Sequence, residues 1–426
     1  MIKKVLTNKE LYWTFLYQFL TLVGGIILIK LLATTLSKET YGFYALIMSV
    51  VAFIVMMPFS ALMQGVSRYI SIYKDKNRYI NFLKTVLLLY VILIFIYLFV
   101  SFVYKSIFTL GVVWDGIYYF VVLFSISEII KILLRTINNT NRERKNLTFS
   151  IFIEFGLKII LLYIVSKYYN ISINEVLTIF IIANSLSIIS MLFKNKQIFN
   201  LNHIDTKEMK IYIYRIWIFS YPLVIWALFG WLRDMSNRWY LDYFLDKEQV
   251  ALFAMMGSIA MIAPTALSGL IGGFIMPIIY QKENKEKGYA RRFLFKLLPS
   301  VFGVFLLSFI VTYIFKSEII MIIADKKYLE IAWMLPWMFL VFCIYSLSMM
   351  ATYELFAHKQ TKRLIYSSIF PGIISMIFGY IFIKHYGING ALYNYIITYL
   401  SYAILTFIVV FKYWKNNSYK EVLIEK

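Results

Sequence analysis

Two stretches of the chain that are otherwise apolar enough to cross a membrane are interrupted by charge. The charged residues are Glu128, Lys131, Arg135, Glu154 and Lys158. The first three follow one another at i, i+3 and i+7 and the last two at i, i+4, so each set occupies one face of a helix. Counted at about 1.5 Å per residue from the basic loop between the stretches, Lys131 and Glu154 lie at one depth, and Glu128 and Lys158 lie deeper. Opposite charges are therefore expected to meet inside the membrane.

Such charges have two interpretations, and the sequence leaves both open. Intramembrane charge is costly and usually functional, but opposite charges at one depth also form ion pairs that lock two helices together. On the functional interpretation, Lys131 and Lys158 bind an anionic cargo, while Glu128 and Glu154 couple transport to an ion such as a proton or sodium. Further candidates for cargo binding are cations near helix ends, where snorkelling or solvation is the structural alternative: Lys30, Arg233 and Arg238.

Enzyme chemistry finds no support in the sequence. The chain has no P-loop glycine pattern, no nucleophile motif and no paired carboxylates near a His. The single Cys excludes an intramolecular disulfide, and three His with that one Cys argue against a dedicated zinc or iron site. We therefore predict no enzyme activity, no catalytic residue, no metal site and no cofactor.

The elements that position the charged residues are membrane helices. The 426 residues are 61% hydrophobic and 15% charged, with a mean hydropathy of +0.73, which excludes a soluble globular protein. A spanning helix needs about 20 mainly apolar residues. The stretches that qualify are 11–29, 41–67, 85–104, 114–137, 147–170, 176–193, 216–232, 249–281, 297–315, 331–353, 364–383 and 386–411. The predicted fold class is an all-α integral membrane protein with about twelve transmembrane helices.

Lys and Arg residues predict the orientation of these helices, because they accumulate in cytoplasmic loops. With the N-terminus inside, 29 of the 43 lie at cytoplasmic ends and 10 at outer ends. Both termini are therefore expected to be cytoplasmic. The net charge of +21 is loop charge scattered over the cytoplasmic side, so it does not indicate a nucleic-acid partner.

Two pairs of similar segments within the sequence predict that the chain consists of two similar halves. Residues 36–49 align with 245–258 at an offset of 209, and 167–172 align with 384–389 at an offset of 217. Six helices per half give both halves the same orientation, with a pseudo-two-fold axis along the membrane normal. Transporters that rock two lobes around a central site are built in this way. The predicted domains are a lobe at 1–194, a cytoplasmic linker at 195–210 and a lobe at 211–426.

Three short segments resemble a known family. Leu36–Leu46, LSKETYGFYAL, resembles its pattern LGPEEYGLYAL; Asn237–Leu245, NRWYLDYFL, resembles DRYILGYFL; and Tyr386–Ala391, YGINGA, resembles YGIIGAA. These patterns are typical of polysaccharide and O-antigen flippases, the Wzx-type members of the multidrug/oligosaccharidyl-lipid/polysaccharide exporter superfamily. The chain departs from them where Ser37-Lys38 replaces Gly-Pro and Asn237 replaces Asp, so no charged role is carried over to position 237.

The resemblance implies a flippase that moves an undecaprenyl-diphosphate-linked oligosaccharide across the bacterial cytoplasmic (inner) membrane by alternating access. The product would be the O-antigen of lipopolysaccharide, a capsule or a similar polysaccharide. The implied partners are the lipid-linked oligosaccharide, the lipid bilayer, a glycan polymerase and a chain-length regulator. Two alternatives stay open. A drug/cation antiporter of the same superfamily shares the fold but needs acids for its cationic cargo. A membrane glycan polymerase needs a long outer loop, and the longest here are about 233–248 and 316–330.

Overall fold

Every regular element in the described part of the chain is helical. The computed structural model describes residues 9–75, 78–109, 111–192, 206–283, 286–358 and 360–424. Eleven helices in these ranges are long and apolar enough to cross a membrane. The last, Lys362–Lys415, has 54 residues, and it is broken at Gly387, whose φ of 56° lies in the left-handed region. Because one crossing needs only about 20 residues, this helix supplies two spans, and the predicted all-α fold of about twelve spans is confirmed.

The chain divides into two compact units. Unit 1 comprises residues 1–36 and 47–227, and unit 2 comprises residues 37–46 and 228–426. The lobes and the linker expected from the sequence stay a prediction. Most of that linker, 195–205, lies outside the described residues, and its remaining residues begin a long helix.

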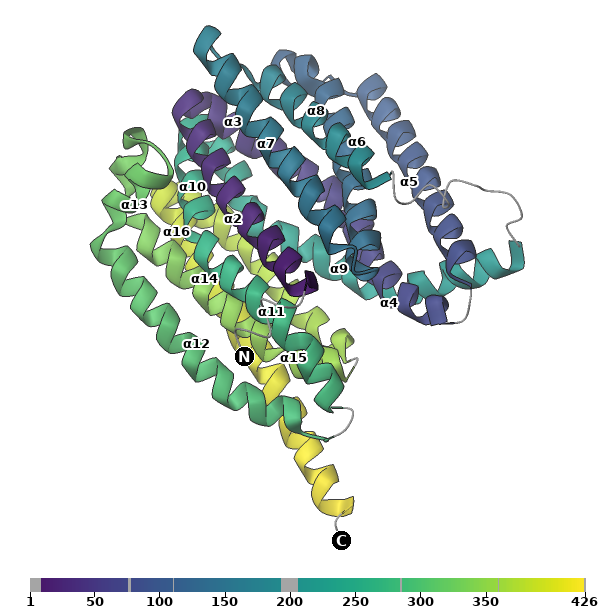
Figure 1. The fold of residues 1–426 in the computed structure, drawn as a ribbon. Coiled ribbons are helices and arrows are strands. Elements are labelled where there is room, and N and C mark those ends of the chain that lie inside the picture. The colour runs from purple at the N-terminus through teal and green to yellow at the C-terminus, as the bar shows by residue number, and fades with distance from the viewer. Residues whose placement is uncertain are drawn as a thin grey trace. The chain divides into compact units, whose positions relative to one another are not determined.

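Unit 1 is a bundle of long helices. They are α2 (Lys9–Thr35), α4 (Ala61–Asp75), α5 (Tyr79–Ile107), α6 (Val112–Thr140), α7 (Arg144–Tyr168) and α8 (Ile173–Leu192). Two further helices, α3 (Lys38–Ile54) and α9 (Thr206–Phe244), contribute residues to both units. In unit 1, α8 packs against both α6 and α7, and α2 runs alongside α7 (Figure 1). Long apolar runs become helices because lipid offers no partner for a backbone N–H or C=O, and a helix satisfies both internally.

A tight hairpin sets α6 against α7. The first helix ends at Thr140 and the second begins at Arg144. Asn146 donates a side-chain hydrogen bond to Asn138 Oδ1 at 2.9 Å, and Arg142 turns the chain with a φ of 62°. The turn fixes the register of the two helices, so their charged faces point toward each other.

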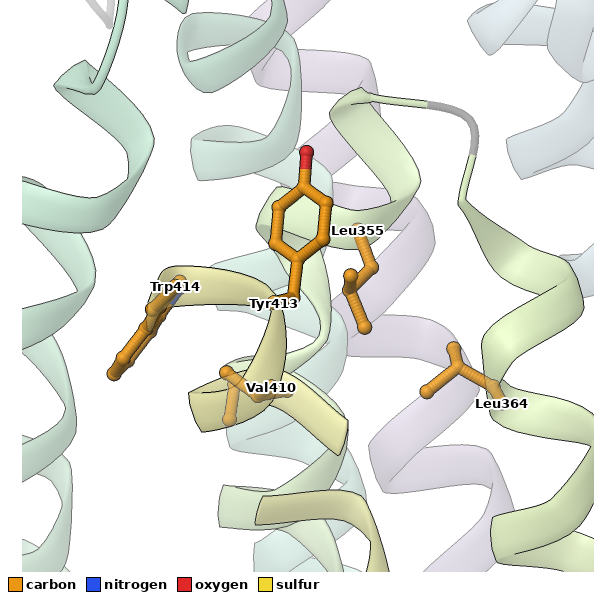
Figure 2. Packing of buried hydrophobic residues seen from close by; sticks show 6 residues of the cluster. Leu355, Leu364, Val410, Tyr413 and Trp414 are labelled. Atoms are coloured by element: carbon orange, nitrogen blue, oxygen red, sulfur yellow. The ribbon is translucent and has the colours of Figure 1, made fainter. Parts of the chain in front are cut away.

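Unit 2 contains the remaining helices. They are α10 (Lys247–Ala260), α11 (Ile262–Glu283), α12 (Tyr289–Ile314), α13 (Lys316–Ile323), α14 (Met334–Ala351), α15 (Tyr353–Ala357) and α16 (Ile365–Ile424). Of these, α14 packs against α10, α12 and α16. Figure 2 shows a buried apolar cluster of unit 2 formed by Ala351, Leu355, Leu364, Val410, Tyr413 and Trp414. This cluster joins the C-terminal part of α16 to the end of α14 and to α15.

The two similar segments at an offset of 209 residues, 36–49 and 245–258, are in contact within unit 2. A Cβ added at Gly42 of α3 would lie 1.8 Å from the carbonyl oxygen of Lys247 and 3.2 Å from the backbone nitrogen of Ala251. The alignment places Ala251 at the position equivalent to Gly42. Small residues at equivalent positions of the two repeats therefore let α3 and α10 touch, which gives the glycine of the family-like segment a packing role.

Candidate functional site

Glu154 of α7 is the centre of a buried charge network in unit 1. Its Oε1 accepts hydrogen bonds from the Nζ atoms of Lys131 at 2.9 Å and Lys158 at 2.6 Å, and its Oε2 accepts one from Arg135. Only 5% of the Glu154 side chain is exposed. One carboxylate thus pairs with three cations, and two of these lie on α6, so the network ties α6 to α7.

A buried amide of α8 completes the network. The Nδ2 of Asn184 donates to Glu128 Oε1 at 2.8 Å, and its Oδ1 accepts from Lys131 at 3.0 Å. Lys131 also donates to Glu128 at 2.5 Å, so with its bond to the central carboxylate it uses all three of its N–H groups. The Nζ of Lys158 lies 4.6 Å from the centre of the Phe180 ring, a cation–π contact. Both lysines are therefore enclosed by partners.

The depth count from the sequence predicts the direct ion pair of Lys131 with Glu154, but it does not predict the direct partner of Lys158. Lys131 and Glu154 meet as predicted. The count also places Glu128 opposite Lys158, but the ion pair of Lys158 is with Glu154, one turn away on its own helix. Residues at i and i+4 face each other on a helix, so this pair forms without help from the neighbouring helix. The sequence offers only a weak signal for Asn184, which is a single amide in an apolar stretch.

Charge and exposure are unevenly distributed over the network. Three cations face two acids, which leaves one positive charge in excess. The side chains of Lys131 and Lys158 are 5% and 6% exposed, whereas Arg135 is 21% and Glu128 is 19% exposed. The network therefore has a closed interior and an accessible edge, formed by one base and one acid. Excess positive charge with an accessible guanidinium favours an anionic ligand.

Another buried cation, Arg233, lies in unit 2. The sequence predicts a helix end in solvent here, but α9 continues to Phe244 and the Arg233 side chain is only 3% exposed. The prediction is wrong because Asp234 pairs with the guanidinium. The Nε donates to Asp234 Oδ1 at 2.7 Å and a terminal nitrogen donates to Oδ2 at 3.1 Å, so the two charges neutralise each other within the helix.

Three tyrosines surround the guanidinium of Arg233. The ring centres of Tyr345 on α14 and of Tyr402 and Tyr399 on α16 lie 4.7, 4.9 and 5.1 Å from its central carbon. The Tyr399 hydroxyl also donates to Asp234 Oδ1 at 2.6 Å. Cation–π contacts and the ion pair thus hold the arginine in place. Within the described ranges, its second terminal nitrogen is buried without a hydrogen-bond partner.

The remaining two cations predicted to contact cargo are Arg238 and Lys30. Arg238 is half-buried and donates to the carbonyl oxygen of Ala45 at 3.1 Å. Lys30 is half-buried in α2, where its carbonyl oxygen accepts a hydrogen bond from Thr34. Of the predicted site residues, the structure brings together Glu128, Lys131, Glu154 and Lys158.

Comparison with known proteins establishes the fold. No family model matches the chain, and no curated protein matches it in sequence. In structure it is similar to the lipid II flippase MurJ in an inward closed conformation, with a TM-score of 0.72 and 16% identity over 94% of this chain and 87% of that one. It is also similar to an outward-facing multidrug resistance MATE family transporter of the MOP superfamily, with a TM-score of 0.66 and 13% identity over 96% of both chains. For the MATE transporter VcmN of Vibrio cholerae, the TM-score is 0.63 and the identity 13%, over 96% of this chain and 95% of that one.

Identities of 13–16% relate folds and not activities. The proteins to which the chain is similar are a flippase and transporters, rather than enzymes. The chain therefore has the fold of the MOP-superfamily transporters.

Proposed function

We propose that the protein is a flippase that moves an undecaprenyl-diphosphate-linked oligosaccharide across the bacterial cytoplasmic membrane by alternating access, for O-antigen, capsule or a similar polysaccharide. The observation that carries the proposal is the buried network around Glu154, where three cations face two acids. A net cation within a membrane span is costly. An anionic headgroup offsets that cost, whereas a purely structural hairpin lock would need only balanced charges.

The cargo defines what the protein must supply. A diphosphate cannot cross hydrocarbon unaided, and its oxygens are bound best by Lys and Arg. The cations along the spans supply the positive potential that attracts this cargo, and the candidates are Lys158, Lys131, Lys30, Arg233 and Arg238. We assign ion coupling to Glu128, whose side chain is partly exposed, and to Glu154, whose carboxylate pairs with the cations of the network. The exported unit would pass to a glycan polymerase and a chain-length regulator.

A drug/cation antiporter is the second candidate, because the chain is also similar in structure to multidrug resistance transporters. A cationic cargo needs an acid whose charge is not already neutralised. In the described spans, Glu128, Glu154 and Asp234 each pair with a Lys or Arg. This pairing favours the anionic cargo.

Deleting the gene tests the proposal in cells. We expect lipid-linked glycan to accumulate on the cytoplasmic leaflet and surface polysaccharide to disappear. A plasmid copy of the gene should reverse both effects. The measurements are extraction of lipid-linked glycan and staining of the surface polysaccharide. Unchanged polysaccharide together with altered sensitivity to cationic drugs would favour the antiporter instead.

A further inference from the structure

Helix α6 exposes two opposite faces. One stripe is apolar and consists of Tyr119, Leu123, Ile126 and Ile130. A second stripe lies half a helical turn away, at about 100° per residue, and consists of Glu128, Ile132, Arg135 and Asn139. Most residues between the stripes are buried. The helix therefore presents an apolar face and a separate polar face.

The two faces of α6 need different surroundings. Tyr119 and Leu123 are 69% and 54% exposed, which suits contact with lipid tails. Glu128 and Arg135 cannot face hydrocarbon without a large free-energy cost. The polar stripe is thus the face that meets water or a polar cargo, and Arg135 is its only basic residue.

Hydrogen-bond capacity separates Arg135 from Lys131, and exposure separates it from Lys158, whose side chain is 6% exposed against 21% for Arg135. Lys131 has three N–H groups and three acceptors, so it has no donor left for a ligand. A guanidinium has five donors, and Arg135 commits a terminal nitrogen to Glu154. Its Nε is buried without a partner among the described residues. Arg135 thus combines spare donors with an accessible edge, and Lys131 has neither.

We propose that Arg135 is the residue of unit 1 that contacts a phosphate of the cargo, while Lys131 and Lys158 position Glu154 and supply the positive potential. This inference rests on the proposed function. A guanidinium held on one side by a carboxylate still offers a planar edge that matches two phosphate oxygens. Arg135 lies five residues, about 7.5 Å, before the end of α6 at Thr140. On the predicted orientation that end is cytoplasmic, which is the side where the headgroup of a lipid-linked cargo enters.

The test measures binding of farnesyl diphosphate, a soluble lipid diphosphate, to the purified full-length protein by titration calorimetry, with farnesol as the uncharged probe. We expect Arg135→Gln to weaken farnesyl diphosphate binding by about tenfold or more, because a hydrogen-bonded charge contact is lost. Arg135→Lys keeps the charge but not the planar fork, so its loss should be smaller. Farnesol binding should not change. Arg142→Gln is the matched control, since Arg142 lies on the same hairpin with its side chain 74% exposed.

Three outcomes decide the matter. Weaker diphosphate binding by the Arg135 variants, with the Arg142→Gln control at the wild-type value, supports the assignment. Wild-type affinity in both Arg135 variants overturns it and leaves the proposed flippase function standing. A wild-type protein that binds no lipid diphosphate but binds a cationic dye such as ethidium overturns both. If Arg135→Gln fails to fold, Arg135→Lys decides alone, because it retains the ion pair with Glu154.

Discussion

Replacing Glu154 with Gln is expected to destabilise the protein by about 3–5 kcal/mol, the usual cost of removing one partner from a buried ion pair. The carboxylate contacts Lys131, Lys158 and Arg135, and Gln keeps the shape but not the charge. Glu128 would then be the only acid in the network facing three cations. Thermal unfolding of the purified protein in detergent measures the effect.

Two variants sharpen this prediction. Glu128→Gln should be milder, because Glu154 pairs with three cations whereas Glu128 forms its ion pair with Lys131, and Glu128 is 19% exposed. Glu154→Gln raises the net charge of the network from +1 to +2, and adding Lys158→Met returns it to +1. The double variant should therefore be more stable than Glu154→Gln alone. The account of the network is wrong if Glu128→Gln is as damaging as Glu154→Gln, or if the double variant is the least stable.

Gly42→Ala is expected to have the second large effect. The new Cβ would lie 1.8 Å from the carbonyl oxygen of Lys247, a backbone atom that cannot rotate away. The first turns of α3 and α10 must therefore move apart. Overpacking of this kind typically costs about 1–3 kcal/mol, and contact with the backbone places it at the upper end or beyond. A lower unfolding temperature and a smaller yield of monodisperse protein should report it.

The matched control is Gly257→Ala, the same substitution in α10. A Cβ there meets nothing within 4 Å, so the better helix propensity of Ala should leave stability unchanged or raise it by up to about 1 kcal/mol. Equal behaviour of the two alanine variants would show that α3 and α10 do not touch at Gly42.

The sequence predicts the helices well, because a spanning helix needs little more than an apolar run of sufficient length. It predicts helix ends less well where a charge finds a partner inside the helix. The apolar stretch 216–232 stops at Arg233, yet α9 continues to Phe244, and Asp234 pairs with that arginine within the helix. In the sequence, an adjacent acid and base such as Arg233 and Asp234 look the same whether solvent or tyrosine side chains surround them.

The candidate site is only partly predictable for a similar reason. Spacing places Lys131 level with Glu154, and the two do meet. Spacing does not say that Asn184 of α8 takes the third hydrogen bond of Lys131, because that contact depends on how α8 packs against α6. From spacing alone, Lys131 is as suitable for binding cargo as Arg135. The structure separates the two residues, because the Lys131 side chain is 5% exposed and the Arg135 side chain is 21% exposed.

The most direct test of the central claim is transbilayer movement of an undecaprenyl-diphosphate-linked oligosaccharide in liposomes that contain the purified protein. The labelled lipid-linked sugar starts on the inner leaflet, where an impermeant glycosidase added outside cannot cleave it. Cleavage therefore measures its arrival on the outer leaflet. We predict that the wild-type protein makes this protected pool accessible to the glycosidase, and that Arg135→Gln slows this movement while Arg142→Gln does not. A protected pool that stays inaccessible with wild-type protein, in liposomes that do transport a cationic dye, would contradict the account.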